Sequence, residues 1–119
     1  MEKRLFEKVG YFDIDFPVCE DYEFWLRVTS SCPVLLLDKK LTLKEGGHDD
    51  QVSKIYLGRM DKFRIAGIVK LLDSSALDEK QRSLAIQALK KKCKIYGAGC
   101  AKRGRLEEAE YYQNLVDKY

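Results

Sequence analysis

The chain has 119 residues, of which 45% are hydrophobic and 34% charged, as in one ordinary globular domain. Its net charge of +3 is too small to require a polyanionic partner, and no nucleic acid is expected, because aromatic residues do not alternate with the basic ones. No apolar run approaches the ~20 residues that span a bilayer, and the N-terminus lacks the apolar stretch of a signal peptide, so we expect a cytoplasmic chain.

The first half of the chain predicts two helices and a short β element. Residues 2–9 form a short helix that ends at Gly10, and residues 20–30 form a second, in which Glu23 and Arg27 pair at i, i+4. The segments "PVLLLD" and "LTL" indicate two short strands, joined as a hairpin or at a sheet edge by residues 38–40.

The second half predicts helices only. Apolar periodicity favours one helix over about residues 51–72, then a helical hairpin over about 78–118 with a turn at Gly104. The hairpin has the small-residue spacing of one tetratricopeptide-type repeat, which alone cannot build a solenoid. The expected fold class is mainly α with a short β hairpin or two-stranded element, that is, α+β.

The cysteines and the basic residues can both be explained without a catalytic role. The four cysteines form no Cys-x-x-Cys pair, so we expect reduced, mostly buried thiols. Basic residues crowd the segment 90–105, which is interpreted as a solvated helix face or, alternatively, as a surface for phosphates, nucleic acid or lipid head groups. They are Lys90, Lys91, Lys92, Lys94, Lys102, Arg103 and Arg105.

Two places carry candidate chemistry. In "CEDYEFWLR", Glu20 and Asp21 precede an aromatic cluster. One interpretation is structural: the two carboxylates stabilise the helix by lying at the positive end of its dipole. The other is functional: one of them, desolvated beside Trp25, acts as a general base. In "GGHDDQ", His48 is either an exposed loop residue or a group that binds a metal or a phosphate at a helix start.

The order of motifs resembles family 2 glycosyltransferases, which are inverting enzymes that use nucleotide-diphosphate sugars. The resemblance covers about residues 3–55 and is carried by four segments in order. These are Gly10, Phe12 and Asp13; the run Glu20, Asp21, Tyr22, Glu23, Trp25, Leu26 and Arg27; the "P-V" strand; and Gly47, His48, Gln51 and Ser53.

The resemblance implies roles for individual residues. Asp21 matches the catalytic base that takes the proton of the acceptor hydroxyl, and Glu20 and Trp25 would shape the acceptor pocket. His48 matches a loop residue that reaches the diphosphate or its metal, and is therefore the candidate metal ligand. A weaker part of the resemblance implies that Lys44 adds positive charge nearby. Ile14 departs from the family, whose members commonly carry an acid at that position.

The resemblance also implies that this chain is one part of a larger enzyme. The nucleotide-binding β-α-β units of the transferase fold find no counterpart here, so we expect a C-terminal fragment of a glycosyltransferase α/β fold that is inactive alone. Residues 1–55 would be its acceptor-side part and residues 56–119 its C-terminal helices. The complete enzyme would use Mg or Mn, with no cofactor expected for this chain alone.

Partners and alternatives follow from the same expectation. The complete enzyme would bind a nucleotide-sugar and a carbohydrate or lipid-linked acceptor, in the cytoplasm or peripherally at the inner membrane face. The chain alone would self-associate through an exposed apolar face. The alternatives are a non-catalytic helical interaction module, and a regulatory or vestigial fragment.

Overall fold

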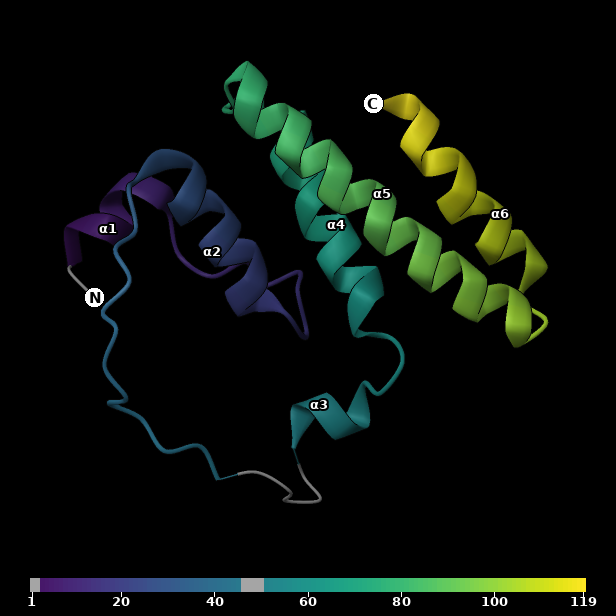
Figure 1. Ribbon diagram of the computed structural model, residues 1–119, viewed down its shortest axis with the longest axis horizontal. Coiled ribbons are helices and arrows are strands. Elements are labelled where there is room, and N and C mark those ends of the chain that lie inside the picture. The colour runs from purple at the N-terminus through teal and green to yellow at the C-terminus, as the bar shows by residue number, and fades with distance from the viewer. Residues whose placement is uncertain (1–2, 46–50) are drawn as a thin grey trace.

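The computed structural model describes residues 3–45 and 51–119, and this part of the chain consists of helices joined by turns and extended segments (Figure 1). Within these residues no helix is both long and apolar enough to cross a bilayer. The elements are α1 (Lys3–Val9), α2 (Glu20–Ser31), α3 (Val52–Ile55), α4 (Met60–Asp73), α5 (Glu79–Lys102), α6 (Leu106–Leu115) and the 3-10 helix η1 (Val116–Lys118).

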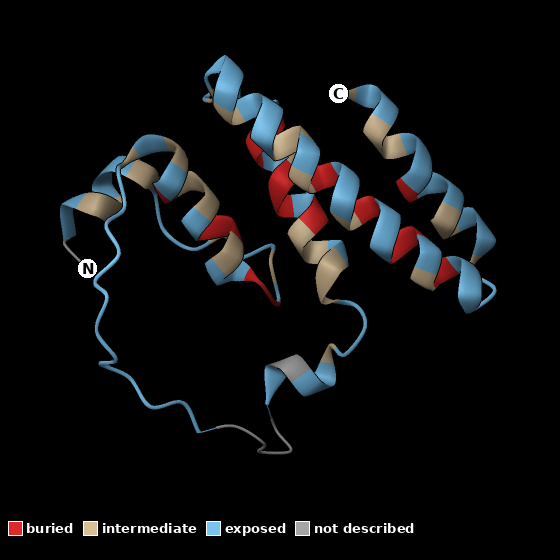
Figure 2. Cartoon of the chain, in the orientation of Figure 1, coloured by how far each residue is buried: buried red, intermediate tan, exposed pale blue. Residues whose placement is uncertain are grey.

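The core lies where α5 packs against both α4 and α6 (Figures 1 and 2). The predicted helical hairpin forms as α5 and α6, with Gly104 at φ +75° in the turn between them. Gly97 permits the close approach of the two helices, because a Cβ atom there would lie 3.4 Å from the Ala109 carbonyl oxygen. The buried core side chains come from all three helices: Ile65, Ile68, Leu72, Leu89, Cys93, Tyr96, Cys100 and Tyr112.

The N-terminal helices form a second, smaller packing unit that docks on α4. Phe24 of α2 is fully buried, with ring centroids 5.3 Å from Phe6 and 4.8 Å from Phe12. At the contact between α2 and α4, a Cβ atom on Gly67 would lie 3.6 Å from Glu23 Cβ. A Cβ atom would therefore be in ordinary van der Waals contact there, and a larger side chain at position 67 would have to push the two helices apart.

The four cysteines are free, as expected, and three of them are buried. Cys93 and Cys100 belong to the core, and Cys19 lies in the turn before α2. The Cys93 and Cys100 thiols therefore act as small apolar side chains.

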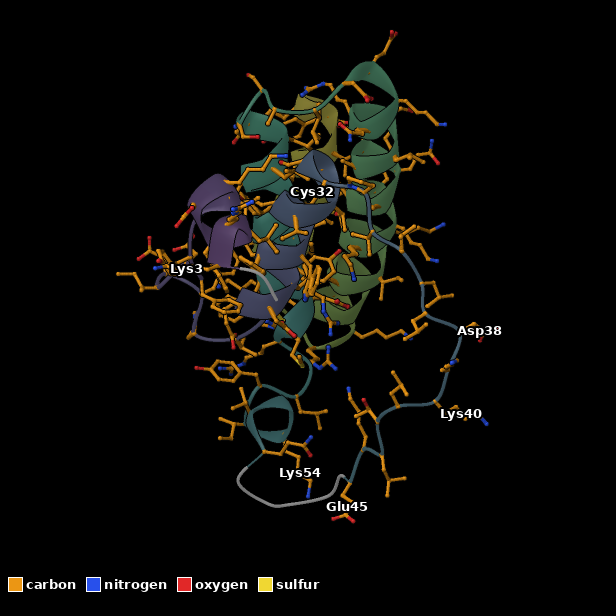
Figure 3. The ribbon with its side chains drawn as sticks, turned by 90° about the vertical axis from the view of Figure 1, so that its left-hand side faces the viewer. Lys3, Cys32, Asp38, Lys40, Glu45 and Lys54 are labelled. Carbon is orange, nitrogen blue, oxygen red and sulfur yellow. The ribbon has the colours of Figure 1, made fainter. Side chains whose placement is uncertain are left out.

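The predicted β hairpin is wrong. Residues 33–45 are extended and exposed, and no strand is assigned in the described ranges, which are therefore all-α rather than α+β; the α/β transferase fold is not seen. Figure 3 shows the segment running away from the helices through Asp38, Lys40 and Glu45. A segment of high β-propensity does not form a strand unless a second strand pairs with it. Here the Lys39 N–H donates to the Leu37 carbonyl at 2.8 Å, which is a local bond within the segment.

The single helix predicted over about 51–72 is also interrupted. It is divided into α3 and α4, and Gly58, at φ +76°, lies in the connection between them. A left-handed backbone conformation cannot continue a right-handed helix, so the chain turns before α4 begins.

Candidate functional site

The predicted acids lie in the first turn of α2. Cys19 adopts φ +62° immediately before this turn, and its thiol lies 3.7 Å from the Met60 carbonyl oxygen at the start of α4. Glu20 and Asp21 are both exposed, and the Tyr22 N–H donates to Asp21 Oδ1 at 2.7 Å. The turn therefore presents two carboxylates to solvent at the positive end of α2.

Trp25 lies one helical turn after Asp21 and leaves 44% of its surface exposed. Its ring meets the buried Phe24 ring edge-on, with centroids 6.1 Å apart. Asp21 and Trp25 therefore occupy one face of α2 at i, i+4 spacing, as the sequence indicated. We call Glu20, Asp21 and Trp25 the acidic patch; it is an exposed surface of α2.

Desolvation of one of the two acids is not observed. The buried carboxylate is Glu23, at 2% exposure. Its two oxygens accept hydrogen bonds from Arg27 at 2.8 Å, confirming the predicted i, i+4 pair, and Lys70 of α4 lies 3.3 Å away. This acid therefore joins α2 to α4 through its ion pair with Lys70, a role that the sequence did not reveal because Lys70 is distant along the chain.

A second group of charges lies beside Tyr22, the residue that follows Asp21 in α2. Asp61 bonds Arg64 at 3.0 Å and Lys92 at 3.2 Å, and the Lys92 ammonium lies 5.7 Å from the centre of the Tyr22 ring. Burial opposes ionisation of Asp61, but these two hydrogen bonds outweigh it and hold the pKa of its carboxyl below the ordinary value. Burial raises the pKa of the nearby Cys19 thiol. No local signal in the sequence links Asp61 to Lys92.

The proposed metal ligand His48 lies outside the described residues. Among the residues that are described, no group of three or more His, Cys, Asp or Glu side chains could hold a metal ion.

A groove of about 1080 Å³ lies between α4 and α6, and no residue of the acidic patch lines it. Its apolar lining includes Ala66 and Val69 of α4 and Tyr111 and Leu115 of α6. Sequence reasoning missed this groove because it depends on how the hairpin is placed against α4, which no local pattern reports.

Comparison of the chain with protein-family models, with curated proteins and with solved structures finds no match. The order of the sequence motifs and the geometry of the described residues are therefore the only guides to its chemistry.

Proposed function

We propose that this chain supplies the acceptor side of an inverting glycosyltransferase, with Asp21 as the general base. The observation that carries the proposal is the order of the four sequence motifs, with the acid pair and Trp25 in the second of them. The exposure of Asp21 beside a half-exposed indole supports it, because an acceptor sugar can reach both side chains.

In the proposed reaction, the acceptor hydroxyl oxygen attacks the anomeric carbon of the donor sugar. A new carbon–oxygen bond forms as the bond from the anomeric carbon to the diphosphate breaks, with inversion. The Asp21 carboxylate takes the hydroxyl proton, and the exposed Trp25 ring gives the sugar an apolar face to lie against. The diphosphate leaves with the bonding electron pair. Glu20 helps to shape the acceptor pocket.

The donor half of the site is proposed to come from outside these residues, which makes the chain alone inactive. The metal, Mg or Mn in such an enzyme, would be held there too. An in-frame coding segment before Met1, with strand–helix repeats and an Asp-x-Asp pair, would support this arrangement. A mature protein that starts at Met1 in its native cells would contradict it.

The base is tested by Asp21→Asn in the complete transferase. Loss of a general base costs about 10²–10⁴-fold in turnover, whereas binding of the nucleotide-sugar should persist. Asp15→Asn is the matched control, because Asp15 is also an exposed carboxylate close to α2 along the chain. Near-normal turnover of Asp21→Asn would refute the assignment.

A helical interaction module is the second candidate, and the groove between α4 and α6 is the observation that favours it. Ala66 is an exposed small residue of the groove, so Ala66→Glu places a charge there without disturbing the core. A partner that copurifies with the chain should be lost from Ala66→Glu and retained by Glu110→Gln on exposed α6 surface. Retention by both variants would rule out the groove.

A further inference from the structure

Three arginines from two distant segments line one small concavity at an end of the helical bundle. Arg59 comes from the connection between α3 and α4, and Arg103 and Arg105 come from the turn between α5 and α6. Leu57 and Gly58 complete the lining of a volume of about 260 Å³. Figure 1 shows that this connection and this turn lie at the same end of the bundle. We call this concavity the arginine pocket.

Backbone geometry holds the arginine pocket together. Gly58, at φ +76°, turns the chain so that Arg59 precedes α4, and Gly104, at φ +75°, lies between the other two arginines. Arg103 Nη1 donates to the Gly99 carbonyl at 2.9 Å. A Cβ atom on Gly58 would lie 3.9 Å from Arg103 Nη2, so the guanidinium of Arg103 rests against the α3–α4 connection.

The pocket carries an excess of positive charge. All five of its lining residues belong to the described part of the chain, and none of these five is acidic. Arg105 is paired with Glu108 at 2.5 Å, which offsets one of the three charges. The partner that the structure gives to Arg103 is a carbonyl, which carries no net charge. About two positive charges therefore converge without a compensating carboxylate in the lining.

The ends of three helices also contribute to the electrostatic potential of the arginine pocket, which stays positive. α4 begins immediately after Arg59 and α6 immediately after Arg105, so two positive helix ends lie at the pocket. α5 ends at Lys102, and its negative end is covered by Arg103, which bonds a carbonyl of the last turn. The pocket therefore favours an anion.

We propose that the arginine pocket binds the phosphoryl group of a phosphate monoester or diphosphate. The planar donor fork of a guanidinium matches phosphate oxygens, and about two uncompensated charges match a dianion better than a single carboxylate. The volume of about 260 Å³ is below the roughly 300–1,000 Å³ of pockets for whole drug-sized ligands, so the group enters and the rest of the molecule stays outside. This site goes beyond the proposed sugar transfer, because it requires neither Asp21 nor Trp25.

The test is titration of the chain with inorganic phosphate and pyrophosphate, followed by calorimetry and by amide NMR shifts. We expect one site, with shifts at Gly58 and Gly104. Each of Arg59→Gln and Arg103→Gln should weaken binding about tenfold or more, because each removes charge-assisted hydrogen bonds. Both side chains are exposed, so the variants should fold; unchanged far-ultraviolet circular dichroism checks this.

A matched control separates the pocket from general basic charge. Lys91→Gln combined with Lys94→Gln removes two exposed charges from α5 outside the pocket lining. The double lysine variant should bind phosphate as the parent does, and the double variant of Arg59 and Arg103 should not. Absent binding, or equal weakening by the two pairs, would overturn the proposal.

A second experiment, with lipid vesicles, distinguishes a lipid headgroup from a soluble phosphate compound as the ligand. Phosphatidic acid vesicles present the group on a lipid surface, and phosphatidylcholine vesicles provide the zwitterionic control. Sedimentation with phosphatidic acid that depends on Arg59 and Arg103 assigns a lipid headgroup. Binding of soluble phosphate without vesicle binding assigns a free phosphate compound. Vesicle binding that only the lysine pair weakens would count against the pocket.

Discussion

Glu23 is the charged side chain that the described part of the fold buries most completely, at 2% exposure. Its oxygens lie 2.8 Å from Arg27 and 3.3 Å from Lys70, so its removal takes the carboxylate away from Arg27 and leaves Asp13 as the acidic partner of Lys70. Glu23→Ala should lower the free energy of unfolding by about 3 kcal/mol, the lower end for broken buried pairs, because both cations keep some contact with water. Urea unfolding measures this.

The control for Glu23 is Glu110→Gln, an exposed change on α6 that should alter the free energy of unfolding by less than about 0.5 kcal/mol. Equal effects of the two substitutions would show that the ion pairs of Glu23 with Arg27 and Lys70 contribute little to stability.

Asp13 makes stability depend on acid pH. A hydrogen bond from the Lys70 ammonium lowers the pKa of the Asp13 carboxyl from its ordinary value of 3.8. Since the folded pKa is below the unfolded one, this stabilisation is fully present above the unfolded value and is lost as the pH falls through the folded pKa. Asp13→Asn should flatten the fall in urea midpoint between about pH 5 and about pH 2.

Asp15 provides the comparison for Asp13, because it is a nearby exposed carboxylate whose backbone N–H, not its side chain, bonds Asp13. Asp15→Asn should leave the acid slope unchanged. The same slope in Asp13→Asn as in the parent would refute the role of the pair with Lys70.

At the scale of single elements, α5 begins with a reciprocal cap. Gln81 N–H donates to Asp78 Oδ1 at 2.7 Å, and Asp78 N–H donates to Gln81 Oε1 at 3.0 Å. Gln81 Nε2 also donates to the Ser30 carbonyl at 3.1 Å, which joins this helix start to the end of α2. Asp78→Ala should reduce the free energy of unfolding by about 1 kcal/mol, measured by urea denaturation.

Asp78→Ser should retain most of the stability of α5, because a serine hydroxyl also accepts from the third helical N–H. If alanine and serine at this position were equally stable, the side-chain cap would not be what stabilises the start of α5.

The elements that were predictable carry local signals. α2 and the α5–α6 hairpin follow from apolar spacing and from Gly104, which ends the first arm. The signal for the interruption before α4 was present in Gly58, but a longer apolar stripe concealed it. The strands could not be predicted from the local sequence, because a strand is stabilised by a neighbouring strand, and residues 33–43 have none among the described residues.

The candidate sites show the same limit. The spacing of Asp21 and Trp25 on one face was predictable from helical periodicity, whereas their exposure was not, since it depends on which face α4 covers. The basic segment 90–105 allowed the prediction of a phosphate-binding surface. The contribution of Arg59 could not be predicted, because it depends on the α3–α4 connection lying against the hairpin turn. The spacing of apolar residues predicts helices, but it does not predict which distant residues come into contact.

At the scale of the whole molecule, the extended segment after α2 is exposed along its length (Figure 2) and carries several exposed apolar side chains. Leu35 and Leu36 are 93% and 91% exposed, and Leu43 is 87% exposed. Burial of one such side chain gains about 1.5–3 kcal/mol, so contact between copies is favourable. We therefore expect the chain alone to form dimers or larger species in sedimentation velocity as its concentration is raised.

Leu35→Ser combined with Leu36→Ser should shift this equilibrium towards monomer, because it removes the apolar surface that the copies bury. Leu84→Ser is the control: Leu84 is also exposed, at 57%, but stands on α5 away from the segment. It should leave the association unchanged. A monomeric parent chain at high concentration would contradict the prediction, and so would equal dissociation in the control. Association that depends on these leucines would mark this segment as the surface that a donor-binding half of the proposed transferase covers.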